Sequence, residues 1–258
     1  MKEYGLVSII TPSYNSTEFI SEMIDSILAQ TYKNWELLIT DDCSTDDSVE
    51  VIQRYVKKDS RIKLFCLEKN AGGGVSRNNS IKEAKGRFIA FCDSDDLWTP
   101  DKLEKQILFM IEKDAAFSYG SYMLCDTIGK EIGINICLKK LTYARIVMDN
   151  FVGCLSAIYD TEKIGKIYMP TIRKRQDWGL WISVLKKCKI GYGVKQPIGY
   201  YRIRENSVSS NKWVLIRYHA MLYQQMLNIP LFLGYCMYFF VNVPTFLFKT
   251  LRTKIINL

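Results

Sequence analysis

Three carboxylates are concentrated in the short segment CDSDD, in which Asp93, Asp95 and Asp96 directly follow the apolar run RFIAF. Like charges at this spacing repel one another and raise each other's pKa unless a cation lies among them. Hard oxygen ligands of this kind suit Mg²⁺ or Mn²⁺. The spacing therefore predicts a divalent metal site, and an acidic, solvated turn is the alternative.

A second set of candidate residues lies nearer the N-terminus. Tyr14 follows Pro12, and its ring could stack on a nucleobase or close over the next helix. Asp41 and Asp42 stand at an expected strand end, where adjacent acids usually cap the following helix. Arg77 follows three glycines that let the backbone approach a ligand, and a tight turn with a solvated arginine is the alternative. The glycine-rich segment matches neither a P-loop nor a dinucleotide fingerprint, so nothing favours ATP or NAD.

The first hundred residues alternate strand-like and helix-like segments. Apolar runs at 7–11, 36–40, 62–67 and 87–92 predict strands. The first intervening helix pattern follows Asn15 and Glu18, which resemble a capping box. Such alternation predicts a mainly parallel sheet, whose ligands bind beyond the carboxyl ends of its strands. Both acidic segments fall at those ends, so we expect them to face the same crevice.

Length and composition indicate a globular protein. The 258 residues are enough for one α/β domain with an appendage, and 48% apolar residues exclude a disordered chain. The eight cysteines are scattered without a C-x-x-C pair, which favours free thiols in a reducing cytosol over zinc or disulfides. The N-terminal segment lacks the pattern of a signal peptide, and we expect no nucleic-acid partner.

The C-terminal part has a different composition. Residues 231–248 contain no charged side chain and are followed by basic residues, while residues 213–227 are aromatic, basic and amphipathic. The uncharged run is at the lower limit for spanning a bilayer, and Asn242 and Pro244 disfavour a straight span. We predict a helix pair lying in the membrane interface. A helix packed on the core and a true span are the alternatives.

Several motifs occur in a fixed order over about residues 6–210. They are VSIITPSYN, DDCSTD, NAGGGVSRN and CDSDD, followed by RQDWGLW and YYRIRENSVS. In this order they resemble the inverting glycosyltransferases of family 2, particularly those of bacterial surface polysaccharides. The resemblance implies an α/β fold of GT-A type, with a Rossmann-like, mainly parallel sheet flanked by helices. It divides the chain into a GT-A domain at 1–210 and a C-terminal helical segment at 211–258 that we expect to associate with membranes.

The same resemblance implies roles for single residues. Asp95 would bind Mn²⁺ or Mg²⁺, and Asp177 would be the base that deprotonates the acceptor, although a helix N-cap is what the local pattern alone favours for Asp177. Arg173, Arg175 and Arg204 are candidates for contact with a diphosphate or the acceptor. The residues expected to bind the donor nucleotide are Pro12, Tyr14, Asp41, Asp42, Arg77 and Asp93.

Three features depart from the family pattern. Gln176 stands where glutamate is common before the base. Arg204 stands where a histidine is common, which rules out a histidine metal ligand at that position. No Q-x-x-R-W motif is present, which favours single, non-processive addition. His219, the only histidine, is expected to be structural or interfacial.

Together these observations predict a metal-dependent, inverting glycosyltransferase that uses a UDP-sugar. A basic protein with an apolar C-terminal segment would meet its substrate at an anionic membrane face, so we expect a polyprenyl-diphosphate-linked saccharide as acceptor. The expected location is the cytoplasm, peripheral at the inner face of the cell membrane. A metal-dependent phosphohydrolase with a D-x-D motif and an inactive nucleotide-sugar-binding scaffold at the membrane are the alternatives.

Overall fold

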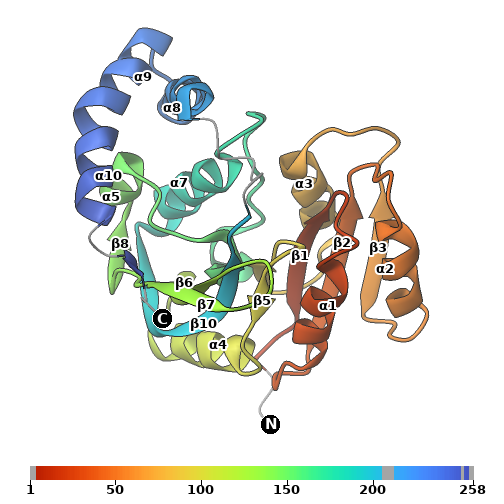
Figure 1. Cartoon of the computed structure of the whole chain (residues 1–258). Helices are drawn as coiled ribbons and strands as arrows, with labels where there is room; N and C mark the ends of the chain where they lie inside the picture. The colour runs from red at the N-terminus through yellow and green to blue at the C-terminus, as the bar shows by residue number, and fades with distance from the viewer. Residues whose placement is uncertain (1–3, 205–211, 251–252, 256–258) are drawn as a thin grey trace.

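The computed structural model describes residues 4–204, 212–250 and 253–255. Its N-terminal half is a parallel sheet with helices on both faces (Figure 1), in the strand order β4, β1, β2, β3. The predicted alternation of strands and helices is confirmed. The elements are β1 (Val7–Ser13), α1 (Ile20–Leu28), β2 (Trp35–Asp41), α2 (Ser48–Val56), β3 (Ile62–Cys66), α3 (Gly73–Glu83) and β4 (Phe88–Phe91).

The strand β1 separates two apolar cores. Successive side chains of a strand point to opposite faces of the sheet, so Val7 and Ile9 join one core and Ile10 joins the other. Ile24 of α1 lies in the first core and Ile81 of α3 in the second. Because both faces are covered, β1 is a continuous apolar run, as parallel strands usually are.

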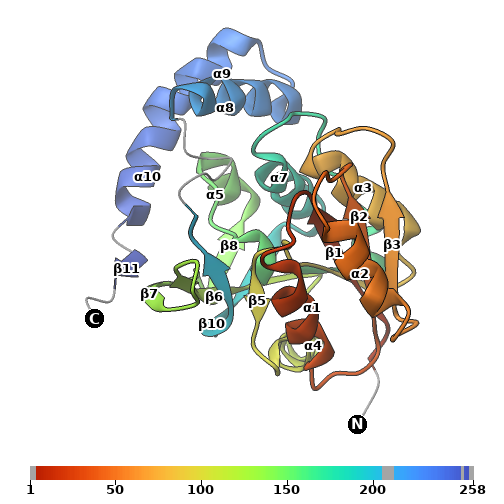
Figure 2. The same ribbon diagram turned by 45° about the vertical axis from the view of Figure 1, so that its right-hand side comes forward.

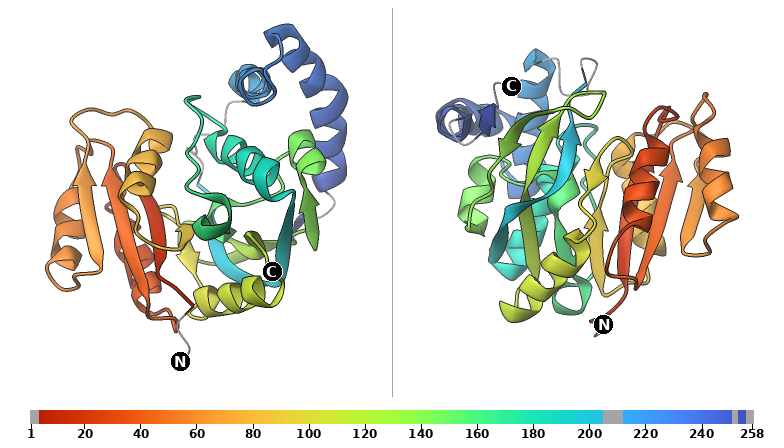
Figure 3. Two further views of the ribbon diagram at one scale, coloured as in Figure 1. Left: turned by 180° about the vertical axis from the view of Figure 1, so that it is seen from behind. Right: turned by 60° about the horizontal axis from the view of Figure 1, so that its bottom comes forward.

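The second half extends the same sheet with strands of both directions. β9 is antiparallel to β4 and β6, and the long strand β10 runs parallel to β6. Figure 3 shows the two halves side by side from behind. The elements are β5 (Leu97–Trp98), α4 (Lys102–Glu112), β6 (Phe117–Cys125), β7 (Glu131–Asn135), β8 (Lys140–Thr142), α5 (Tyr143–Met148), η1 (Cys154–Ser156), β9 (Ile158–Asp160), α6 (Thr161–Ile164), α7 (Gln176–Cys188), β10 (Ile190–Arg202) and β11 (Thr253–Ile255).

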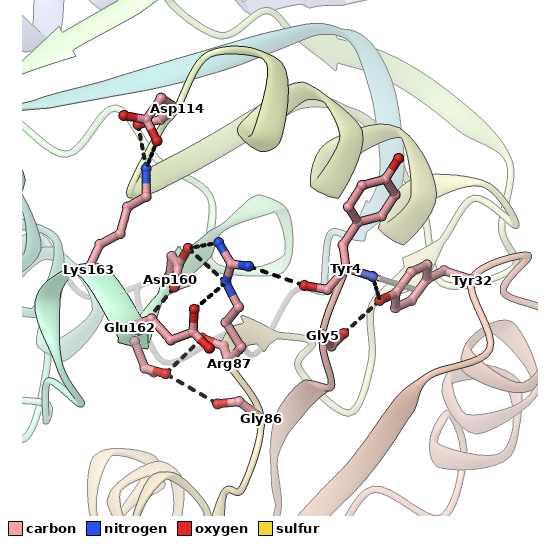
Figure 4. Close-up of polar contacts among 10 residues, drawn as sticks. Tyr4, Gly5, Tyr32, Gly86, Arg87, Asp114, Asp160, Glu162 and Lys163 are labelled. Carbon is pink, nitrogen blue, oxygen red and sulfur yellow. Dashed lines mark hydrogen bonds and ion pairs between the residues drawn. The ribbon is translucent and has the colours of Figure 1, made fainter. Parts of the chain in front are cut away.

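The amino end of β4 is fixed by an ion-pair network (Figure 4). Arg87 donates to the buried carboxylate of Asp160, with 2.8 Å between Nη2 and Oδ2, and to the carbonyl oxygen of Tyr4. The Tyr32 hydroxyl donates to the carbonyl oxygen of Gly5 at 2.6 Å. These bonds join the N-terminal segment to β9. They lie at the amino end of β4, whereas the acidic residues 93–96 follow its carboxyl end.

The predicted capping box at Asn15 is wrong. The helix α1 begins at Ile20, its N-cap is Phe19, and no side chain caps it. The Asn15 side chain instead accepts a hydrogen bond from the Thr45 backbone amide, with 2.9 Å between Oδ1 and N. The side chain therefore ties the loop after β1 to the loop after β2, which a local pattern does not reveal.

The helix α8 (Lys212–Leu227) packs on the core of the sheet domain. Leu222 and Tyr223 are fully buried, and the Tyr223 ring meets the Trp178 ring of α7 edge to face with 5.6 Å between centroids. His219 is also buried against Trp178, with its Nδ1 2.7 Å from the Leu215 carbonyl oxygen. The structural role expected for His219 is confirmed. α8 thus shares a core with residues before 210.

The last helices form an outer layer beyond α5 and α7 (Figure 2), consisting of α9 (Leu231–Met237), a π-helical turn η2 (Tyr238–Asn242) and α10 (Val243–Thr250). Phe232 and Phe240 on this layer are 65% and 81% exposed. Within the described residues, no single helix has the length and apolar character needed to cross a membrane. One helix pair, Leu215–Leu227 with Leu231–Leu247, passes that test jointly but is bent by 114°.

Candidate active site

The acidic loop, residues 93–96, follows the carboxyl end of β4 and closes on itself by a hydrogen bond from the Asp96 amide to the Asp93 carbonyl oxygen at 3.1 Å. The Asp96 carboxylate is buried, and one oxygen accepts from the Arg202 amide while the other has no hydrogen-bond partner. Burial and the negative charges of Asp95 and Asp93 raise the pKa of Asp96 well above its usual value. Asp96 is therefore a buried anchor of the loop.

Arg202 holds the acidic loop in place from β10. Its guanidinium donates to the Asp95 carbonyl oxygen at 3.1 Å, to the Thr127 carbonyl oxygen at 2.6 Å and to the Glu22 carboxylate at 2.6 Å. The residue is only 4% exposed. Three acceptors in different directions suit the fixed fork of a guanidinium. No role for Arg202 was expected from the sequence.

Asp95, the expected metal ligand, forms an ion pair with Arg204, with 2.6 Å between Oδ2 and Nη2. Burial and the charge of Asp93 raise the pKa of Asp95, while Arg204 opposes this rise. The structure thus brings together the predicted metal ligand and the predicted diphosphate contact. The following motif residues, 205–209, lie outside the described residues.

Arg77 connects the glycine-rich loop to the acidic loop. Its Nη2 lies 2.5 Å from Asp93 Oδ1, and its guanidinium covers Gly73, where a Cβ atom would lie 3.1 Å from Nη1. Pro12 borders the same glycine. Burial tends to lower the pKa of Arg77, but the charge of Asp93, reinforced by Asp177, outweighs it and raises the pKa. The predicted nucleotide contacts Pro12, Arg77 and Asp93 therefore lie together.

Asp41 and Asp42 use their carboxylates to shape the loops beside the sheet. Asp41 accepts hydrogen bonds from the amide and hydroxyl of Ser44 at 2.8 and 2.5 Å. Asp42 accepts from the amides of Ala71 and Gly72, both at 2.8 Å. Neither carboxylate caps the helix that follows, because α2 begins at Ser48 with Asp47 as its N-cap, so the helix-capping alternative for this pair is wrong. Beyond β1, Tyr14 is half exposed.

Asp177 lies in the first turn of α7 and accepts a hydrogen bond from the Asn150 side-chain amide, with 2.8 Å between Nδ2 and Oδ2. The Asn150 oxygen accepts from the Val152 amide at 3.1 Å, which fixes the orientation of the Asn150 amide group. Asn150 was missed in the sequence because it lies 27 residues from Asp177 in no recognisable motif.

The start of α7 packs directly against the start of α3. A Cβ atom at Gly74 would lie 2.5 Å from the side-chain amide of Gln176, so only glycine permits the observed approach. Arg175, the residue before α7, has a left-handed backbone with φ of 64° and is partly buried, whereas Arg173 is exposed. The contact brings Asp177, the expected base, toward α3.

Cys154 and Tyr122 are close enough to both the acidic loop and Asp177 for their charges to affect the pKa of each group. Burial raises the pKa of the Cys154 thiol, and Asp93 and Asp177 raise it further although Arg77 opposes them. Burial likewise raises the pKa of the Tyr122 phenol, with Asp96 and Asp177 adding to the effect. The Cys154 thiol and the Tyr122 phenol are therefore both within electrostatic reach of the acidic loop and of Asp177.

The acidic loop suits a divalent cation that takes further ligands from a substrate. Among the described residues, no group of three or more His, Cys, Asp or Glu side chains is placed to hold a metal ion. Mg²⁺ is commonly held by about one or two carboxylates together with substrate phosphates and water. Burial and the repulsion of neighbouring carboxylates raise the pKa values of Asp95 and Asp96, and added positive charge would lower them.

Comparison with known proteins identifies the family. Residues 8–228 match the profile described as glycosyl transferase family 2. The chain belongs to this family. It is thus a glycosyltransferase with the GT-A fold, and the phosphohydrolase alternative is disfavoured.

Three relatives illustrate the similarity. TuaG of Bacillus subtilis, a glycosyltransferase provisionally named for teichuronic acid biosynthesis, is 45% identical over 209 residues, covering 81% of this chain and 83% of TuaG. The Escherichia coli β-1,3-glucosyltransferase WfgD, named for UDP-Glc and α-D-GlcNAc-diphosphoundecaprenol, is 40% identical over 214 residues, which is 83% of each chain. The structure of Staphylococcus aureus TarS with UDP-GlcNAc superposes with a TM-score of 0.71 at 24% identity. That match covers 85% of this chain and 65% of the TarS chain, and it supports the fold.

Proposed function

We propose that this glycosyltransferase moves a sugar from a UDP-sugar to a hydroxyl of a polyprenyl-diphosphate-linked saccharide, with inversion and one addition per encounter. The observation that carries the proposal is the position of Arg77, which forms an ion pair with Asp93 of the acidic loop and is close enough to Asp177 for that carboxylate to raise its pKa. The name of WfgD, which joins a UDP-sugar to a diphosphoundecaprenol acceptor, supports both substrate classes. The UDP-GlcNAc bound to TarS supports the donor.

In the proposed reaction Asp177 takes the proton of the acceptor hydroxyl. The acceptor oxygen forms a bond to the anomeric carbon as the bond from that carbon to the diphosphate oxygen breaks, and UDP leaves with the bonding electrons. Asn150 holds one oxygen of Asp177, which leaves the other for the proton. Attack opposite the leaving group inverts the anomeric centre.

The donor is proposed to lie along the carboxyl ends of β1, β2 and β4. Tyr14 and Pro12 would border the uracil, Asp41 and Asp42 would hold the base and ribose either directly or through their loops, and Asp93 would face the ribose. Arg77 would contact the nucleotide.

The diphosphate is proposed to lie beside Asp95 and Arg204. Mn²⁺ or Mg²⁺ held by Asp95 would supply Lewis-acid stabilisation of the charge that develops on the diphosphate. Arg204, already ion-paired with Asp95, carries a guanidinium suited to phosphate oxygens. Arg173 and Arg175, before the base, are proposed to contact the diphosphate of the lipid-linked acceptor.

The test measures UDP release from UDP-glucose, UDP-galactose and UDP-N-acetylglucosamine, with Mn²⁺ or Mg²⁺, and with or without a short-chain polyprenyl-diphosphate-sugar. We expect release to require metal and acceptor, and Asp177→Asn to lower it by roughly 10²- to 10⁴-fold. Asp47→Asn is the matched control, because Asp47 is an exposed acid in the N-terminal half of the chain. UDP binding without release under all conditions would favour the inactive scaffold.

We also propose that the protein works at the inner face of the cell membrane, held there by α9 and α10. The exposed Phe232 and Phe240 on this layer and the net charge of +8 support contact with an anionic bilayer. Point substitutions test the membrane contact better than truncation does, because a truncation that removes α8 would also remove part of the core. Phe232→Glu with Phe240→Glu should abolish co-sedimentation with anionic vesicles, whereas Ile128→Glu, at a residue 87% exposed elsewhere, should not. Equal sedimentation of both variants would contradict membrane contact.

A further inference from the structure

Two tyrosines lie near the acidic loop, and one of them is also near the proposed base, Asp177. Tyr122 of β6 and Tyr201 of β10 lie side by side, with 6.0 Å between ring centroids and 51° between ring planes. Both rings come from neighbouring parallel strands, in which Tyr201 pairs with Leu124, two residues from Tyr122 and on the same face. The sheet therefore presents the two rings as one surface.

The tyrosine pair, Tyr122 and Tyr201, extends from the acidic loop toward the segment that holds Asp177. Burial raises the pKa of the Tyr201 phenol, and the charges of Asp96, Asp93 and Asp95 raise it further, so the ring lies near the acidic loop although Arg202 points to the other face of β10. Tyr122 lies flat against Gly153, where a Cβ atom would be 2.4 Å from its Cε1 atom. Gly153 follows the turn in which Asn150 holds Asp177. A group in contact with both rings is thus placed between the diphosphate side and the base.

The chemistry of the pair suits a pyranose. Tyr201 is 38% exposed, and within the described part of the chain no residue is seen to hydrogen-bond to either phenol hydroxyl. Aromatic faces beside hydroxyl groups match a sugar ring, which has an apolar C–H face and hydroxyls at its edge.

We propose that Tyr122 and Tyr201 form the subsite for the transferred sugar of the donor. The rings pack against the sugar and their hydroxyls hydrogen-bond to its hydroxyls, so the pair contributes to the choice of donor sugar. The inference rests on the proposed function, since it assumes a nucleotide-sugar donor whose anomeric carbon lies between the acidic loop and Asp177.

The experiment compares the affinity for UDP with the affinity for each UDP-sugar of the panel, by calorimetry with Mn²⁺, in wild type, Tyr122→Phe, Tyr201→Phe and Tyr201→Leu. Each lost hydroxyl should weaken UDP-sugar binding by roughly 2- to 10-fold, as expected for one hydrogen bond, and leave UDP binding unchanged. Tyr201→Leu should weaken it further. Tyr200→Phe, the next residue on the opposite face of β10, is the matched control and should change neither affinity.

The outcomes separate the two proposals. Wild type that binds no UDP-sugar would overturn the proposed function together with the subsite. If wild type binds a UDP-sugar and every variant keeps the wild-type ratio of UDP affinity to UDP-sugar affinity, the subsite alone is overturned. An unchanged ratio with a raised KM for the acceptor would place the pair on the acceptor side, which also overturns the donor subsite.

Discussion

Replacing Arg202 with methionine should loosen the acidic loop and lower both stability and activity. The substitution keeps the aliphatic stem, so the main loss is the hydrogen bonding of a buried guanidinium. The Glu22 carboxylate is 58% exposed and remains hydrated, so this ion pair should contribute only about 0–1 kcal/mol. The bonds to the carbonyl oxygens of Asp95 and Thr127 are charge-assisted and should contribute about 1.5–3 kcal/mol each where water cannot replace them.

Because Thr127 is exposed, water can compensate part of its lost bond, so we expect a total loss of about 3 kcal/mol. For a domain of this size the loss corresponds to a decrease in Tm of roughly 6–12 °C. The stability of Arg202→Lys should lie between those of wild type and Arg202→Met, because an ammonium keeps the charge but cannot bind three divergent acceptors.

The assay is chemical denaturation of the free enzyme, together with UDP release under the conditions proposed above. Arg54→Met is the matched control, since Arg54 forms an exposed ion pair within α2 and its loss should cost less than about 0.5 kcal/mol. If Arg202→Met destabilises the protein no more than Arg54→Met, the reasoning that Arg202 fixes the acidic loop is refuted.

Three further predictions concern other contacts. Asn150→Ala should lower turnover by roughly 10- to 100-fold, as expected for the loss of one hydrogen bond to a charged group. In an Asp177→Asn background the same substitution should have no further effect on turnover. Equal losses of turnover in both backgrounds would contradict the positioning role of Asn150. Gly74→Ala should change the free energy of unfolding by less than about 1 kcal/mol, because the cost of displacing the flexible end of Gln176 offsets the gain of alanine over glycine within α3; in a Gln176→Ala background the same change should stabilise the protein in denaturation measurements, unless the two sites are independent. Burial tends to raise the pKa of Glu36, but hydrogen bonds from its neighbours lower it overall, so its stabilisation is complete above its ordinary pKa of 4.5 and is lost as the pH falls below it. Glu36→Gln should therefore cost stability at pH 7 and little at pH 3, and a pH-independent difference would disagree.

The sequence alone determined that the two acidic segments lie at one edge of the sheet. Strand and helix periodicity places Asp41 and Asp95 at carboxyl ends of parallel strands, and in such a sheet these ends share one edge. That inference needs only local patterns and a chirality rule. The motif order added the family and pointed to Asp177, which the local pattern favoured only as an N-cap.

Tertiary structure decided which side chains these groups contact. Arg202 and the acidic loop are 107 residues apart, and Asn150 and Asp177 are 27 apart, so no local periodicity relates them. The same holds for Tyr122 and Tyr201, which meet only because β10 pairs with β6 in one particular register. At Asn15 a local pattern predicted the wrong contact. The side chain does not cap α1 and instead accepts a hydrogen bond from a loop 30 residues away. Local propensities contribute fractions of a kcal/mol, whereas burial and satisfied hydrogen bonds between distant segments contribute more. Periodicity therefore determined the sheet and its acidic edge, and long-range packing determined the partners of each acid.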